Sequence, residues 1–305
     1  MFFSRFGIYS FPCIFLSFFI FWGLFHLILT KGEVALEKLK HSKLSFVINL
    51  IICTIFSSAM FAGTVNLLQF DNIFINFLIF SIVLLLCFVI FKKGLKFLNK
   101  INYFLIPFMI IVLFALLISN LSFKGITIPQ TSYGGLSVFY ALLYSLLNTS
   151  NGCVLIAELS SSLTKRQKAR VSFLSALVLM LILLFANVVL LRVPFDEDMP
   201  MLSVLSGWQS VVMMVIIFIG CVTTLFSLVF TSSFSMRGLC NNEFLIFLIS
   251  LIAPLVCSLL GFNFIVTYLY PMASILGAVL LVDLFFIPFF KRADNKIHSS
   301  GKYTK

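Results

Sequence analysis

The sequence predicts an all-α protein that crosses a membrane several times, and three observations carry that prediction. Of its 305 residues, 61% are hydrophobic and only 10% are charged. The mean hydropathy is +1.16, a balance that soluble globular domains do not have. The apolar segments are mostly about 20 residues long and rarely alternate with period two, so helices are favoured over a β-barrel.

Nine segments are expected to span the membrane as a single transmembrane domain. Four of them precede residue 120, namely 7–29, 44–69, 73–91 and 101–119. After a polar connector come 134–160, 171–191, 203–235, 244–261 and 264–290, and a basic tail, 291–305, closes the chain. The segment 203–235 is longer than a bilayer requires, which implies strong tilt or an extension into water.

The basic residues orient these spans. The net charge is +11, and all of the 21 Lys and Arg except Arg5, Lys124 and Arg192 fall on one side of the predicted topology. That side is expected to be cytoplasmic, with the N-terminus outside and the C-terminus inside a bacterial plasma membrane. The apolar composition makes the lipid bilayer the expected partner. Because the position of the basic residues is explained by topology, the net positive charge does not indicate nucleic-acid binding.

One stretch, Tyr140 to Glu158, interrupts an apolar helical pattern with five poor helix formers at residues 148–152. Each disfavours helix by about 0.5–1 kcal/mol relative to Ala, or about 3 kcal/mol together. Broken backbone inside a membrane is tolerated only where protein or a water-filled cavity satisfies it. A break near the midplane is typical of a transporter's binding site. We therefore expect a broken helix here, the alternative being an intact helix with polar groups that bond to neighbouring helices.

The residues of this break are candidates for binding a small polar solute by hydrogen bonds. Gly152 would allow the backbone to approach the solute closely. Ser58, in the second span, lies in a small polar patch that either lines the same cavity or permits tight helix packing. The substrate-binding candidates are Tyr144, Asn148, Ser150, Asn151, Gly152 and Ser58.

The order of the spans suggests an internal repeat. The last five would run as a broken helix, a helix, a very long helix, a short helix and a final helix. The first four would match the last four of these in opposite orientation, so that the partner of the broken helix would lie upstream of Met1. The alternative is a complete protein of nine spans.

The residues Phe2–Gly7, the span that follows them and the stretch Leu142–Asn151 resemble a known family. They are similar to the YkvI-type bacterial membrane proteins, distant members of the amino acid–polyamine–organocation superfamily. This resemblance implies a LeuT-type inverted-repeat core without its first helix, in which 1–119 is the remnant of the first repeat and 134–290 is the second. We expect either that the gene begins upstream of Met1 or that the copy is truncated.

The resemblance also implies a function, namely ion-coupled secondary transport of a small amino-acid-like or amine-like solute by alternating access. In sodium-coupled members, a hydroxyl pair in the eighth helix helps to bind the ion. Gly220, Thr223 and Thr224 occupy similar positions and are the candidates for a Na⁺ site, although membrane threonines commonly bond to their own helix. The alternatives are a solute-sensing receptor like those that detect germinants, or an inactive truncated copy.

Three ionisable residues lie inside the predicted spans, each at a cost of about 2.5–3.5 kcal/mol at the bilayer centre. They are His26, Glu158 and Asp283. Glu158 and Asp283 are the candidates for H⁺ coupling. Since all three fall toward the cytoplasmic ends of their spans, snorkelling or pairing with basic loops is the alternative.

Catalysis is not expected from this sequence. Its seven cysteines are scattered singly and its three histidines are far apart. Neither a metal site nor a disulfide framework follows from that spacing. We therefore expect a non-enzymatic protein without a cofactor beyond the coupling ion.

Overall fold

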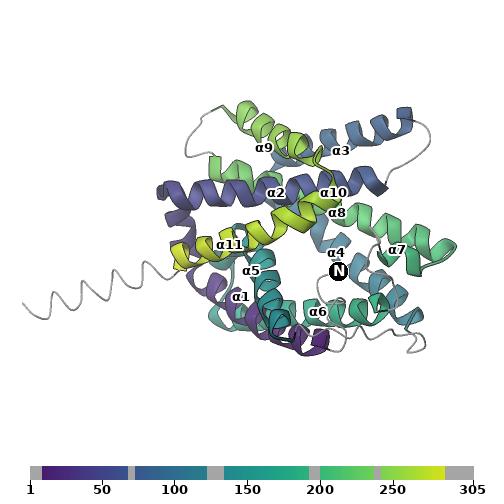
Figure 1. Cartoon of the computed structure of the whole chain (residues 1–305). Coiled ribbons are helices and arrows are strands. Elements are labelled where there is room, and N and C mark those ends of the chain that lie inside the picture. Colours follow the sequence, from purple (N-terminus) through teal and green to yellow (C-terminus); the bar gives the residue numbers. More distant parts are fainter. Residues whose placement is uncertain (1–8, 68–72, 122–133, 192–199, 237–241, 286–305) are drawn as a thin grey trace, which may run out of the picture.

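The computed structural model describes residues 9–67, 73–121, 134–191, 200–236 and 242–285. Within these ranges all regular structure is helical (Figure 1). The helices are α1 (Ser10–His41), α2 (Lys43–Leu67), α3 (Ile73–Lys93), α4 (Leu95–Ser119), α5 (Gly134–Leu159), α6 (Lys165–Leu190), α7 (Pro200–Val204), α8 (Trp208–Met236), α9 (Glu243–Ser258), α10 (Phe262–Phe264) and α11 (Tyr270–Phe285). A 3₁₀ turn, η2 (Ser160–Ser162), extends α5, and a π-helical turn, η3 (Ile265–Leu269), joins α10 to α11.

Seven helices in the described ranges are long and apolar enough to cross a membrane. They are α1, α2, α4, α5, α6, α8 and the continuous run α10–η3–α11. Helix α9 is apolar but has only 16 residues, and α3 has 21 residues ending in two lysines. The all-α prediction is therefore confirmed, while the total of nine spans stays a prediction.

Helix α1 is longer than the span predicted at 7–29. It continues to His41 after a kink at Lys31, whose backbone leaves helical geometry (φ −114°, ψ 17°). The section after the kink was expected to be a loop because it is basic. It is helical because Ala35 and Leu39, four residues apart, are both buried in the core.

The span predicted at 203–235 is wrong as a single helix. The structure divides it into α7 and α8, with Gly207 between them at φ +58°. That left-handed conformation is open to glycine and ends an α-helix. The extra length of this apolar stretch is thus accommodated by a turn.

Two other helices begin earlier than predicted because basic residues join their first turns. Helix α6 starts at Lys165, where Thr164 and Gln167 form a reciprocal capping box. Helix α4 starts at Leu95, directly after Gly94, whose φ of +75° makes a sharp elbow with α3. The polar loops at 70–72 and 196–198 and the basic tail lie outside the described residues.

The helices pack in a layered arrangement (Figure 1). Helix α1 lies along α5 and α6 on one side, and α2 packs on α8 and α9 on the other. Helix α11 lies between these groups, in contact with both α2 and α5. The largest buried cluster joins α1, α2, α5 and α11 through residues such as Ile28, Ile52, Cys153 and Leu280.

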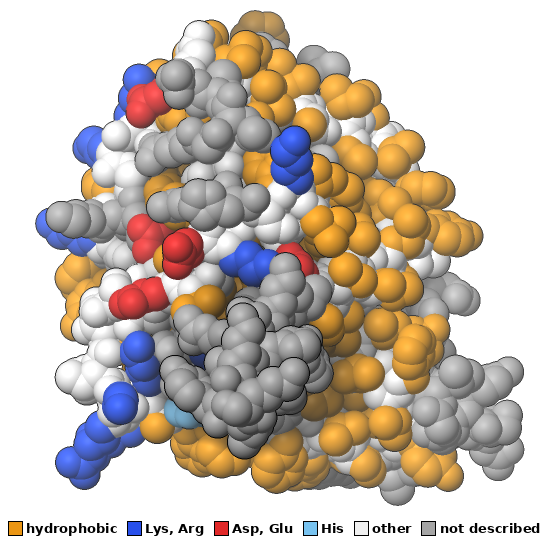
Figure 2. Space-filling view, turned by 90° about the vertical axis from the view of Figure 1, so that its left-hand side faces the viewer, with side chains coloured by type: hydrophobic (Ala, Val, Ile, Leu, Met, Phe, Trp, Pro, Cys, Tyr) orange, Lys and Arg blue, Asp and Glu red, His pale blue; other side chains and the backbone are white. Residues whose placement is uncertain are grey.

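Charged side chains gather on one face of the molecule, next to wide apolar surface (Figure 2). Along the chain, the described charged residues lie at the end of α1, the start of α2, the α3–α4 elbow, the α5–α6 turn, the start of α9 and the end of α11. These are the ends that the topology prediction assigned to one side of the membrane. The orientation of these ends in a membrane stays a prediction.

Two glycines allow α5 to approach its neighbours closely. A Cβ added to Gly32 of α1 would lie 2.6 Å from the carbonyl oxygen of Ala157 and 2.8 Å from the Ser160 Cβ. A Cβ added to Gly277 of α11 would lie 2.9 Å from the Ser150 Cβ. Close approach at small residues is how helices in a bilayer gain van der Waals contact.

We expect Gly32→Ala to destabilise the protein by about 1–3 kcal/mol, since the new methyl group collides with the Ala157 carbonyl oxygen, a backbone atom, as well as with the buried Ser160 side chain. Thermal unfolding of the purified protein in detergent measures this. Gly23→Ala in the same helix is the control, because a Cβ there meets nothing within 4 Å. Equal unfolding midpoints for the two variants would contradict the close crossing.

Candidate functional site

Helix α5 runs without interruption through residues 148–152. The predicted break is therefore wrong. Asn148 donates its side-chain amide to the Tyr144 carbonyl (2.9 Å), and the Ser150 hydroxyl donates to the Leu147 carbonyl (3.0 Å). Both side chains thus bond to the helix they belong to. The helix-propensity cost of about 3 kcal/mol is smaller than the cost of exposing several unpaired backbone groups in a water-free interior, several kcal/mol for each.

Two of the predicted binding residues are packing residues. Ser150 is fully buried against Gly277 of α11. Ser58 is fully buried on α2, where its hydroxyl donates to the Ile55 carbonyl at 2.7 Å. Neither lines the cavity between α4 and α8 or the hollow on the outer surface of α4.

The other predicted residues of α5 share a different side of the helix. Tyr144, Asn148, Asn151 and Gly152 follow three- and four-residue spacing and are all half-buried. The Asn151 Oδ1 atom is buried without a hydrogen-bond partner in the described structure. A Cβ added to Gly152 would meet only Ile156, a residue of the same helix. This side of α5 therefore has spare hydrogen-bonding capacity at Asn151.

Tyr144 is held at the edge of this side by α1. Its ring meets Phe21 in an edge-to-face contact with centroids 6.0 Å apart. Phe21 is itself 1% exposed. The aromatic contact fixes the ring in one orientation relative to Asn148, one helical turn further along.

A cavity of about 240 Å³ lies between α4 and α8. Its walls are Ile106, Met109, Ile110 and Leu113 from α4, and Ile216, Gly220, Thr223 and Thr224 from α8. All three candidates for the cation site therefore line one cavity. The structure brings them together on one face of α8, a helix that also contacts α5.

The two threonines differ in their hydrogen bonds. The Thr223 hydroxyl donates to the carbonyls of Ile219 (2.9 Å) and Gly220 (3.1 Å) of its own helix, as the alternative interpretation expected. For Thr224, no such bond is found among the described residues. Since a hard cation requires several oxygen ligands, Thr223 and Thr224 would supply only part of a coordination shell, and the other cavity walls are apolar.

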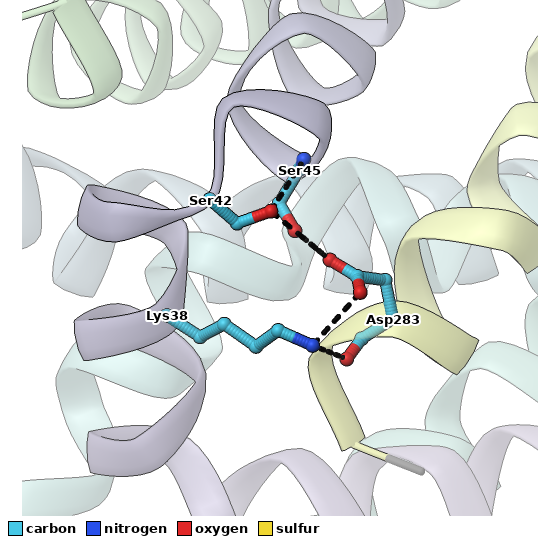
Figure 3. A network of polar contacts seen from close by, with 4 residues as sticks. All are labelled: Lys38, Ser42, Ser45 and Asp283. Atoms are coloured by element: carbon cyan, nitrogen blue, oxygen red, sulfur yellow. Dashed lines mark hydrogen bonds and ion pairs between the residues drawn. The ribbon is translucent and has the colours of Figure 1, made fainter. Parts of the chain in front are cut away.

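The strongest polar network lies elsewhere, where α1, α2 and α11 meet (Figure 3). Asp283 of α11 is 7% exposed. Its Oδ1 lies 2.8 Å from the Lys38 Nζ, which also donates to the Asp283 backbone carbonyl. Its Oδ2 accepts from Ser45 Oγ and, at 3.4 Å, from Ser42 Oγ. Both oxygens of the carboxylate are thus hydrogen-bonded within the protein.

This network matches the pairing alternative for Asp283, with a different partner from the one expected. The basic tail after α11 was the nearest source of positive charge in sequence, but Lys38 stands on the helical extension of α1. Sequence reasoning found Asp283 and missed Lys38, because that section was expected to be a loop. The helical spacing of the apolar residues Ala35 and Leu39 could have revealed this helix. Such a helix places Lys38 next to its buried face.

Glu158, the other candidate for proton coupling, is half-buried near the end of α5. It neighbours Ala157, which Gly32 of α1 contacts. Proton coupling by Glu158 or Asp283 stays a prediction. Within the described ranges, no group of three or more His, Cys, Asp or Glu is placed to hold a metal ion.

These features together define a multi-pass α-helical membrane protein. Its long apolar helices expose wide apolar surface, and its charges gather toward one face. No protein-family model and no curated protein matches the chain.

Removing one partner of the buried ion pair is expected to be costly. Asp283→Leu leaves the Lys38 ammonium, whose side chain is 22% exposed, without its counter-ion. Lys38→Met leaves the carboxylate unpaired. Each should lower stability by about 3–5 kcal/mol, and the double variant should lose less than the sum of the two. Unfolding in detergent across the four proteins measures the coupling.

A second ion pair in the same protein serves as the control. Lys92 and Glu243 lie 3.9 Å apart with side chains 54% and 60% exposed. Lys92→Met should therefore cost less than about 1 kcal/mol. If Asp283→Leu cost no more than Lys92→Met, the network would have no structural role.

Proposed function

We propose that this protein is a secondary transporter of a small amino-acid-like or amine-like solute. It would have a LeuT-type inverted-repeat core in a bacterial plasma membrane, with its charged face toward the cytoplasm. The solute would bind beside α5, and the coupling ion in the cavity between α4 and α8. The observation that carries the proposal is a symmetry in how the helices pack.

In the proposed repeat, α1 to α4 correspond in order to α6, α8, α9 and α11. Two equivalent pairs pack directly on each other, α1 on α6 and α2 on α8. Three further contacts have a counterpart, whereas the pairs α1–α2, α3–α4 and α8–α9 have none of similar extent among the described residues. The pair α2–α9 is matched by α8–α3, α2–α11 by α8–α4, and α1–α11 by α6–α4. A chain whose two parts share one topology in opposite orientation favours such matching.

Among the described residues, no helix is the equivalent of α5 in the proposed repeat. Such a helix would pack on α6 and α4, as α5 packs on α1 and α11. The buried share of the most apolar stretch is 22% in α6 but 39% in its equivalent α1. It is 11% in α4 but 33% in its equivalent α11. The less buried helices are those that the absent partner would cover. This asymmetry supports the repeat, and on this proposal the solute would enter beside α5, α6 and α4.

The chemistry of that region suits a small polar solute. Asn148 and Asn151 offer amide groups on a half-buried side of α5, and Gly152 leaves room beside them. The intact α5 changes the expected mode of recognition. Side-chain amides, rather than free backbone groups at a helix break, would bind the solute.

Transport by alternating access requires the cytoplasmic ends of the helices to separate and close again. The Lys38–Asp283 network joins three of those ends. We assign it to the closed arrangement of that side. A buried and fully bonded ion pair suits this role, because it is stable while formed and is lost as a unit when one helix moves.

Asn151→Leu and Asn148→Leu are expected to abolish solute uptake by the purified protein in proteoliposomes. The reason is that Leu removes the amide and leaves the shape nearly unchanged. Radiolabelled amino acids and amines, each tested alone, are the probes. Asn263→Leu is the matched control, since Asn263 is exposed on α10 and should leave uptake unchanged.

Uptake that persists in Asn151→Leu and Asn148→Leu would remove this side of α5 from the mechanism. A solute that binds to the wild type but is not taken up under any ion gradient would favour the receptor alternative. Equilibrium binding on the same samples distinguishes the two.

Thr224→Val is expected to raise the sodium concentration that gives half-maximal uptake at least severalfold, since it removes a hydroxyl that lines the cavity and is not bonded to its own helix. Thr54→Val on α2 is the control, because the Thr54 hydroxyl donates to the Leu50 carbonyl at 2.9 Å. A sodium dependence unchanged by Thr224→Val would exclude this cavity from ion coupling.

A further inference from the structure

The outer surface of α4 carries a second hollow, of about 610 Å³. It is lined by Phe97, Lys100, Ile101, Phe104, Leu105 and Phe108. At about 100° per residue, these positions form one stripe along the helix. Met109 and Leu113, which line the cavity toward α8, fall on the opposite side. Phe104 and Phe108 therefore face away from the protein, while Phe97 and Ile101, at the other end of the stripe, are half-buried against the core formed by α2, α3, α8 and α9.

This stripe is unusually open for a surface with so many aromatic side chains. Phe104 is 69% exposed and Phe108 is 60% exposed. From Phe97 to Phe108 the helix rises about 16 Å, close to the depth of one bilayer leaflet, about 15 Å. The hollow thus matches one acyl chain in length.

Two lysines make one end of the stripe basic, whereas the other end is apolar. Lys100 lines the hollow itself, and the Lys93 Nζ lies 4.4 Å from the centroid of the Phe97 ring. Neither forms an ion pair within the described residues, unlike neighbouring Lys92, which lies 3.9 Å from Glu243. Gly94, at φ +75°, makes the elbow that brings the end of α3 over the start of α4. Both lysines therefore belong to the part of the stripe nearest the α3–α4 elbow, and neither is paired with a carboxylate in the described ranges.

We propose that this face binds one anionic phospholipid. An acyl chain lies along Ile101, Phe104 and Phe108, and the phosphate lies at the other end of the stripe, beside Lys93, Phe97 and Lys100. A second copy of the chain packed face to face fits less well, because the described residues that line the hollow include no acidic partner for the lysines. The phosphate and the chain are recognised at opposite ends of the stripe, so the site requires both parts of the same molecule.

Native mass spectrometry of the detergent-solubilised protein tests this, with phosphatidylglycerol and phosphatidylcholine of identical chains as probes. We expect phosphatidylglycerol to bind more tightly. Its affinity should fall about fivefold for each lysine in Lys93→Gln and Lys100→Gln, as expected for about 1 kcal/mol per basic residue. Phe104→Ala should weaken binding of both lipids.

The matched control is the double variant Lys165→Gln/Arg166→Gln, which removes two exposed charges from the start of α6. An equal loss of phosphatidylglycerol in this control would overturn the site, since binding would then follow net charge alone. Competition by inorganic phosphate at millimolar concentration would likewise overturn it, because the site would then recognise a free anion. So would a wild-type dimer that Phe104→Ala separates, which would show a second copy on this face. Thermal unfolding without lipid verifies that each variant is folded.

Discussion

The close packing of α5 between α1 and α11 is the constraint on which the rest of the structure depends. At Gly32 and Gly277 the neighbouring helices approach so closely that no side chain fits between them. Thr149 and Ser150 are fully buried as a result. Water is excluded from that side of α5, so its backbone groups can be satisfied only within the helix. The continuity of α5 through five poor helix formers follows from its neighbours rather than from its own sequence.

This explains which parts of the structure could be predicted from the sequence. Hydropathy and basic clusters located most of the long helices to within a few residues at one or both ends. These two signals are reliable because each reflects the transfer of side chains between water and lipid. Features that depend on tertiary contact were missed. The extension of α1 falls between the predicted spans 7–29 and 44–69, and its buried Ala35 and Leu39 are separated by charged residues that hide the helical pattern. The partner of Asp283 was missed because Lys38 lies far from it in sequence.

The candidate site was predicted unevenly for the same reason. Gly220, Thr223 and Thr224 line one cavity because they share a face of a helix, and periodicity reveals that. The polar residues of α5 separate into two groups because they point in different directions around the helix. Asn148, Asn151 and Gly152 lie on the open side and Ser150 lies on the packed side. Composition alone marked all of them as one site.

Helix α4 connects the two proposals physically. Only 11% of its most apolar stretch is buried, yet one side of it forms a wall of the cavity that contains Thr224, and the other side carries the aromatic stripe. It is a wall one helix thick between the membrane and the cavity. Few contacts with other helices fix the position of α4. Contacts on its membrane-facing side therefore influence the position of its cavity-facing side. A lipid bound along the stripe would therefore act on the shape of the cavity, because the same helix forms both surfaces.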